Sequence, residues 1–137
     1  MKTYLLLSSL LFIVLTACDQ RSIEQHTLSA NCDNNYPCQF TSGIKVALSN
    51  IDISPETPFD VYAELPAGAT IVSAQLEGVT MYMGYIPLKF TKTQNTFVAN
   101  AMVGICSERT MTWRLVLAVE LASGEITKVN YFFNSHY

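Results

Sequence analysis

The sequence has few of the residues that enzymes use to move protons or to attack bonds. It contains only two histidines, His26 and His136, and neither stands in a recognisable relation to a serine or cysteine nucleophile. The carboxylates are scattered singly, with no close pair to divide acid and base roles. A glycine-rich phosphate loop is absent, as are the Cys-x-x-Cys and His-Glu-x-x-His metal motifs. These absences predict a protein that is not an enzyme.

The chain also has little charge and no basic excess. Eight Lys and Arg residues stand against eleven Asp and Glu residues, which gives a formal net charge of −3. Such a chain cannot neutralise a run of phosphates, so nucleic acid is excluded as a partner, and no polybasic segment is present for anionic lipid. No apolar run reaches the ~20 residues that a membrane-spanning helix needs.

The apolar run from Leu5 to Leu15 instead has the length of a secretory signal. Lys2 supplies its positive start, and Leu15-Thr16-Ala17 leads into Cys18. This layout matches the lipobox of bacterial lipoproteins, in which the chain is cut before the cysteine and the thiol is acylated, for example with palmitate. We therefore expect a signal peptide at 1–17 and a lipidated Cys18 that anchors the chain in a membrane. An ordinary signal peptide with a chance cysteine is the alternative.

The residues after Cys18 predict a tether and one domain. Asp19 resembles the inner-membrane retention signal of enteric lipoproteins, which favours the inner membrane with the chain facing the periplasm. Residues 18–36 are polar and show no sustained period, so we expect a lipidated tether there, with His26 solvated in it. Residues 37–137 are enough for one domain and too few for two.

From Phe40 onward the chain consists of short alternating runs of apolar and polar residues, separated by Pro, Gly and Asn turns. No segment keeps a helical period for three turns. The alternating runs begin near Ile44, Phe59, Val72, Val79, Phe97, Trp113 and Val129. The pattern predicts an all-β fold, an immunoglobulin-like antiparallel β-sandwich of about seven strands.

Three cysteines remain once Cys18 is lipidated, and an exported protein meets an oxidising compartment that favours disulfides. Cys32 and Cys38 lie in a turn-rich stretch where they can close a short loop. Alternatively, one of them joins Cys106 across the domain, and the spacing alone leaves both arrangements open. Because a long closed loop restricts the unfolded chain more, by about 4 kcal/mol, we favour Cys38–Cys106 with Cys32 as the odd thiol.

The segment Thr80-Met81-Tyr82-Met83-Gly84-Tyr85 stands out chemically. On a strand, residues two apart share a face, so Met81 and Met83 present two thioethers side by side. Met111 and Cys106 are expected at neighbouring strand ends, and His136 can approach them. Thioethers select Cu(I) over harder ions, which makes Met81, Met83 and Met111 a candidate Cu(I) site. The alternative, which the sequence favours, is that these methionines fill gaps in an aromatic core.

With these residues in view, the chain resembles small proteobacterial lipoproteins that share three short motifs. Here the motifs are Pro37-Cys38, Met81-Tyr82-Met83-Gly84, and Cys106 followed by Met111-Thr112-Trp113. The layout over roughly residues 36–134 is similar to YtkA-like and FixH-like domains, which are compact sandwiches linked to copper handling and cytochrome oxidase assembly. The resemblance implies a Cys38–Cys106 disulfide and singles out Met81, Met83 and Met111. The chain lacks the methionine- and histidine-rich cluster of a copper carrier.

The expected function is therefore a membrane-tethered, non-enzymatic binding or assembly-factor domain, serving copper handling or a respiratory complex. Its partners are the lipid membrane, through Cys18, and a periplasmic or inner-membrane protein. The aromatic stretch 81–90 and the tail 131–133 are candidate partner surfaces, unless their alternate members belong to the core. The alternatives are an inhibitor of cell-wall lytic enzymes and a structural envelope lipoprotein.

Overall fold

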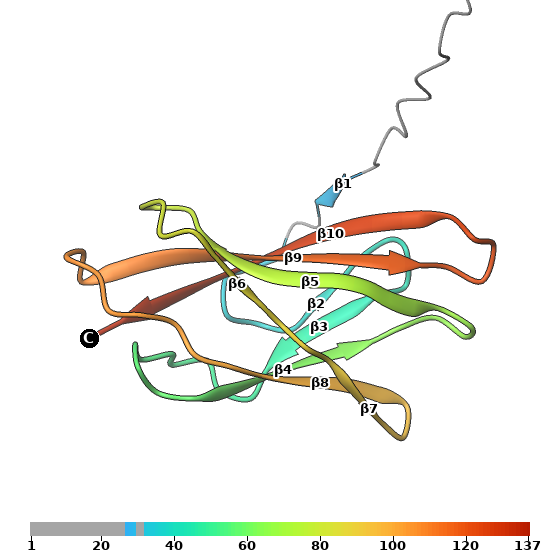
Figure 1. Ribbon diagram of the computed structural model, residues 1–137, viewed down its shortest axis with the longest axis horizontal. Helices are drawn as coiled ribbons and strands as arrows, with labels where there is room; N and C mark the ends of the chain where they lie inside the picture. Colours follow the sequence, from blue (N-terminus) through green and yellow to red (C-terminus); the bar gives the residue numbers. More distant parts are fainter. Residues whose placement is uncertain (1–26, 30–31) are drawn as a thin grey trace, which may run out of the picture.

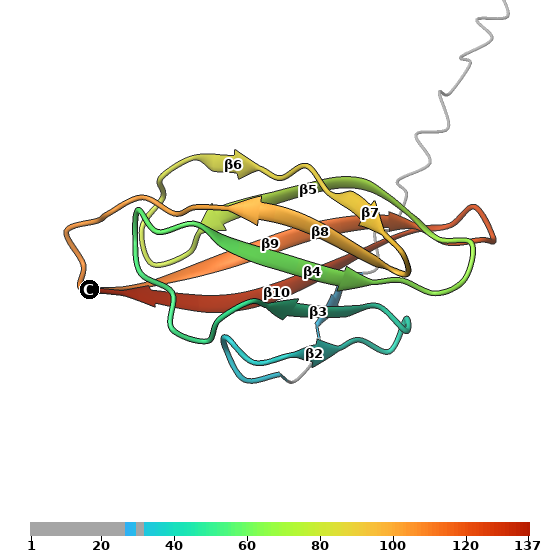
Figure 2. The ribbon, with the colours of Figure 1, turned by 90° about the horizontal axis from the view of Figure 1, so that it is seen from below.

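A computed structural model describes residues 27–29 and 32–137 of the chain, and the regular elements in these ranges are all β-strands. Two five-stranded sheets lie face to face as a sandwich (Figures 1 and 2). The expected all-β, immunoglobulin-like sandwich is thereby confirmed. No helix in the described ranges is long and apolar enough to cross a membrane. The expected signal peptide at 1–17, Cys18, Asp19 and His26 lie outside the described residues.

The first sheet, sheet A, has the order β1-β10-β9-β5-β6. Its strands are β1 (Thr27–Ser29), β10 (Ile126–His136), β9 (Thr110–Glu120), β5 (Thr70–Gly78) and β6 (Tyr85–Pro87). β1 runs parallel to β10, and the other neighbours in this sheet are antiparallel. β9 and β10 form a long hairpin that runs the length of the molecule (Figure 1).

The second sheet, sheet B, has the order β2-β3-β4-β8-β7, and all its neighbours are antiparallel. Its strands are β2 (Cys38–Gln39), β3 (Lys45–Leu48), β4 (Phe59–Glu64), β8 (Thr96–Ala101) and β7 (Thr91–Thr93). The described chain thus has more strands than the seven or so expected. The additional ones are two or three residues long, too short to produce a visible alternation.

The core lies between the sheets and follows the alternation of the long strands. Trp113, Leu115 and Leu117 of β9 are essentially buried, and Tyr131 and Phe133 of β10 lie beside them. Five apolar side chains on two adjacent strands bury enough surface to account for much of the stability, at about 1.5–3 kcal/mol each.

Contacts between aromatic and polar groups fix the arrangement of this core. Phe133 meets Phe59 of the opposite sheet edge to face, with ring centroids 5.6 Å apart. The indole Nε1 of Trp113 donates a hydrogen bond to the Ser135 hydroxyl at 3.1 Å, which satisfies a buried donor. Burial raises the pKa of Tyr131 to about 12, so this phenol stays neutral in the core.

The sequence predicts an extended stretch at 79–90, interrupted by Gly84 and Pro87, but its first half is not a strand. β5 ends at Gly78, residues 79–84 form a loop, and β6 begins only at Tyr85. The backbone turns back at Gly84, whose φ of 74° is readily available only to glycine. Met81 and Met83 therefore lie on a loop, and the prediction that they share one face of a strand was wrong.

The domain also begins earlier than residue 37. β1 pairs with β10 in the register Thr27↔Lys128 to Ser29↔Asn130, within the range assigned to the tether. Asn35 is buried, with only 9% of its surface exposed. The polar composition of this range was misleading, because the side-chain amide of Asn35 bonds to the backbone of the domain.

Candidate functional site

One end of the sandwich gathers three loops and the C-terminus. We call it the loop end, and it consists of residues 49–58, 79–85 and 102–109 with Tyr137. Backbone hydrogen bonds tie the parts together: Glu56 N donates to Val103 O at 2.8 Å, and His136 N donates to Ile53 O at 3.0 Å. Tyr137 adds a bond from its hydroxyl to the Cys106 carbonyl at 2.8 Å. In Figure 1 this end is at the left, beside the marked C-terminus.

The loop end carries most of the exposed large hydrophobic side chains of the described chain. Twelve such side chains are exposed, and nine belong to the loop end: Ile51, Val79, Met81, Tyr82, Met83, Tyr85, Met102, Ile105 and Tyr137. Tyr82 is 86% exposed, so its ring faces solvent almost completely. No charged residue occurs in 79–85 or 102–107. The exposed charged residues of the loop end are Asp52, Glu56, Glu108 and Arg109, which lie outside these two segments. A concentrated apolar surface of this kind marks a binding site.

Two sulfur atoms from separate loops meet on this surface. The Cys106 thiol lies 3.5 Å from the Met81 thioether, as a weak hydrogen bond from Sγ to Sδ. Met81 is 41% exposed and Cys106 is half-buried, so both sulfurs are at the surface. The loop after β5 and the loop before β9 bring them together. The sequence placed Cys106 near the methionines, and the structure bears out that proximity.

Met83 lies beside the loop that carries Cys106. A Cβ placed on Gly104, two residues before Cys106, would be 3.7 Å from the Met83 methyl group. Met83 is also 41% exposed. We call Met81, Met83 and Cys106 the sulfur cluster. The cluster comprises the thiol and thioether in contact and a second thioether on the adjacent loop, which together are a soft ligand set.

Met111 is not part of the sulfur cluster. Its side chain is 2% exposed and points into the core, where its methyl group lies against Gly78. The sequence grouped Met111 with Met81 and Met83. In β9, however, Met111 occupies one of the alternate positions that face the core, two residues before Trp113. His136 lies at the loop end and is exposed, opposite Thr110 in the β9–β10 register.

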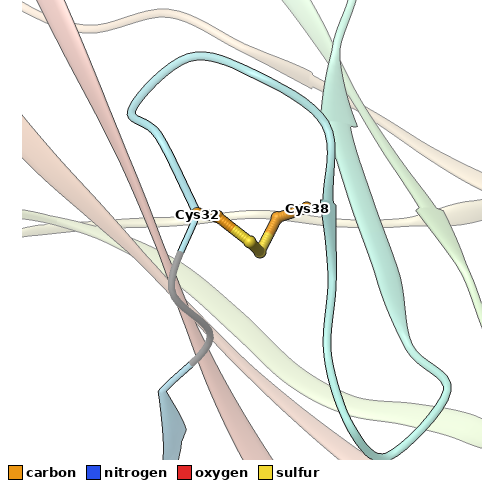
Figure 3. The surroundings of a disulfide bond; sticks show 2 residues. All are labelled: Cys32 and Cys38. Atoms are coloured by element: carbon orange, nitrogen blue, oxygen red, sulfur yellow. A yellow bond between two sulfur atoms is a disulfide. The ribbon is translucent and has the colours of Figure 1, made fainter.

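The disulfide differs from the favoured prediction. Cys32 is bonded to Cys38, with sulfurs 2.01 Å and Cα atoms 5.6 Å apart, as Figure 3 shows. Cys106 is the free cysteine among those described. The prediction of Cys38–Cys106 was wrong because loop-closure entropy concerns the unfolded chain, whereas the folded geometry decides which thiols can meet. Cys38 lies at the start of β2 at one edge of sheet B, and Cys106 lies in the loop end.

The loop closed by this disulfide holds Asn35, a residue that the sequence gave no reason to single out. The Asn35 amide nitrogen donates to the backbone oxygens of Ile51 at 2.7 Å and Asn134 at 2.8 Å. Its side-chain oxygen accepts from Asn134 N at 2.7 Å. Asn35 thus joins the start of the domain to β10 and to loop 49–58 of the loop end, with a φ of 69° that asparagine tolerates better than most residues.

Two ion pairs lie on the outer faces of the sheets, outside the loop end. Glu77 and Arg114 form an ion pair on the outer face of sheet A, and this hydrogen bond holds the pKa of Glu77 below its usual value. A shallow groove on the outer face of sheet B contains the Lys45–Glu64 ion pair, at 3.2 Å, beside Tyr62. Within the described residues, no three His, Cys, Asp or Glu side chains gather as a metal site. The loop end is therefore the stronger candidate.

Comparison with known proteins gives no family for this chain: no protein-family model matches it, and neither does any curated protein. The similarity to YtkA-like and FixH-like domains stays a prediction.

Proposed function

We propose that this chain is a non-enzymatic binding domain that is lipid-anchored in the inner membrane, faces the periplasm and acts through its loop end. Its role is that of an assembly or delivery factor, of the kind that serves copper handling or a respiratory complex. The observation that carries the proposal is the concentration of uncharged, exposed apolar side chains at the loop end. The membrane anchor rests on Leu15-Thr16-Ala17-Cys18.

The opposite end of the sandwich supports this assignment by contrast. β9 is eleven residues long, so its two ends are roughly 35 Å apart at about 3.4 Å per residue. At the far end lie the 65–69 turn and the 121–125 hairpin turn, on the right in Figure 1. Neither of these two turns, both of which the structure describes, carries an exposed large hydrophobic side chain. Leu65 and Leu121 pack against the core instead. Beside these turns, only Val72 and Ile126 of the described residues are exposed large hydrophobic side chains, against nine at the loop end. The exposed apolar surface is thus concentrated at the loop end, which favours it as the docking surface.

Photo-crosslinking in intact cells tests which end binds. A photoreactive residue replaces Tyr82 in one variant and Ser123, in the far hairpin turn, in a matched control; both side chains are exposed, so neither change disturbs the core. We expect one dominant adduct, with a periplasmic or inner-membrane protein, from position 82 only. Equal adducts from both positions, or none from position 82, would contradict the proposal. An adduct with a cell-wall lytic enzyme would instead identify an inhibitor.

Lipidation gives a second prediction. Replacing Cys18 by Ser removes the thiol that accepts the acyl chains, so the variant should no longer incorporate labelled palmitate. The matched control is Cys106→Ser, which leaves the lipobox unchanged and should be labelled like the wild type. Labelling that persists in Cys18→Ser would overturn the anchor. Membrane fractionation of both variants supplies an independent readout.

A further inference from the structure

The sulfur cluster sits inside the proposed binding surface, and its chemistry narrows what that surface handles. The thiol of Cys106 and the thioether of Met81 are both soft donors, and neither belongs to a disulfide or to the core. Soft sulfur ligands select Cu(I), whereas harder ions prefer carboxylate, carbonyl and water ligands. Segments 79–85 and 102–107 contain no charged residue, and the nearest carboxylate to Cys106 along the chain, that of Glu108, is exposed to solvent.

The separation of the two sulfurs suits a shared ion. Two metal–sulfur bonds of about 2.3 Å that meet at a roughly tetrahedral angle place the sulfurs about 3.8 Å apart. The Cys106 and Met81 sulfurs are 3.5 Å apart. A rearrangement of only a few tenths of an ångström is therefore needed to admit an ion between them.

Neighbouring groups fix the loop that carries Cys106 and leave space for a third sulfur ligand. The Tyr137 hydroxyl fixes the Cys106 carbonyl at 2.8 Å, so the C-terminus orients the loop that carries the thiol. Gly104 has no side chain to fill the space beside the Met83 methyl group. Met83 is unbranched and flexible, so its thioether is free to reorient beside the loop that carries Cys106.

We infer that Cys106, Met81 and Met83 form a binding site for one Cu(I) ion, with the Cys106 sulfur as its principal ligand. This inference deepens the proposed function and rests on the loop end as the working surface. When the copper–sulfur bond forms, the Cys106 thiol gives its proton to solvent and the copper keeps its +1 state, so no oxidant or reductant is consumed. Met111 takes no part.

Anaerobic Cu(I) titration of the full-length protein in mild detergent, against a chromophoric Cu(I) chelator, tests the site. No thiol reductant is added, so that Cys32–Cys38 stays closed. We expect one ion per chain for the wild type and a loss of about 100-fold or more in affinity for Cys106→Ser, since even the loss of an outer-shell partner costs ~10–100-fold. Met81→Leu should weaken binding by at least tenfold, on the same basis.

Met102→Leu is the matched control, because it removes an exposed thioether of the same loop that lies outside the sulfur cluster. Its affinity should equal that of the wild type. X-ray absorption at the copper edge of the wild-type complex counts the sulfur neighbours without any variant, and three are expected. Wild-type affinity in Cys106→Ser, or a Met102→Leu loss equal to that of Met81→Leu, would overturn the ligand set. Absence of binding in the wild type would overturn the copper site alone, since the position-82 adduct tests the proposed function separately.

Discussion

Replacing Asn35 by Ala is expected to lower the free energy of unfolding by about 3–4 kcal/mol. The change removes two hydrogen-bond donations and one acceptance, and it leaves Ile51 O, Asn134 O and Asn134 N without their partner. Each buried polar group left unsatisfied costs about 1–3 kcal/mol. The φ of 69° adds about 1 kcal/mol of strain for alanine. Urea denaturation of the full-length protein measures the loss.

The Asn35→Gly variant separates the loss of the side-chain hydrogen bonds from the backbone strain at positive φ. Glycine adopts a positive φ without strain but makes none of the side-chain bonds. We expect it to recover about 1 kcal/mol relative to Asn35→Ala and to remain well below the wild type. If both variants were within 0.5 kcal/mol of the wild type, a size typical of neutral surface changes, Asn35 would not connect the start of the domain to the loop end.

The second large effect is expected for Gly78→Ala. A Cβ at this position would lie 2.3 Å from the Met81 carbonyl oxygen and 2.5 Å from the Met111 methyl group. The methyl group belongs to a flexible side chain, but the carbonyl belongs to the backbone, so loop 79–84 must move. Overpacking of this kind costs about 1–3 kcal/mol. Because Met81 is displaced, Cu(I) affinity should fall together with the urea midpoint.

Gly104→Ala is the matched control for Gly78→Ala. It adds the same methyl group at the same end of the sandwich, but there the new Cβ lies 3.7 Å from its nearest neighbour, the Met83 methyl group. An ordinary van der Waals contact should leave the urea midpoint close to that of the wild type. A Gly78→Ala variant as stable as Gly104→Ala, with unchanged loop contacts, would show that the space above Gly78 is not filled by the Met81 backbone.

The long strands could be predicted because their alternation is unambiguous. β9 and β10 bury every second residue over most of their length, and this period of two already shows in Trp113, Leu115 and Leu117. The short strands β1 and β2 could not be predicted, because two or three residues show no period and their pairing depends on distant partners. The role of Gly78 could not be predicted either, because it consists in leaving space for the backbone of Met81, which only the fold brings close.

The candidate site was anticipated in part. The sequence drew attention to Met81 and Met83 and placed Cys106 near them, but it assigned Cys106 to a disulfide. The odd number of cysteines after Cys18 was the available signal that one thiol stays free; which one depends on the approach of Cys32 to Cys38 in the fold. Met111 was grouped with the others because its facing depends on the phase of β9, which is fixed by packing against sheet B.

The position of the disulfide also determines how the domain carries mechanical load. A pull on the N-terminal end of the chain reaches the described domain first at β1, whose pairs with β10 extend only from Thr27 to Ser29. Once those pairs separate, tension arrives at Cys32 and crosses the covalent bond directly to Cys38. Residues 33–37 are bypassed, so the Asn35 hydrogen bonds are shielded from the force. The disulfide therefore passes force from the N-terminal segment directly to β2 of the sandwich.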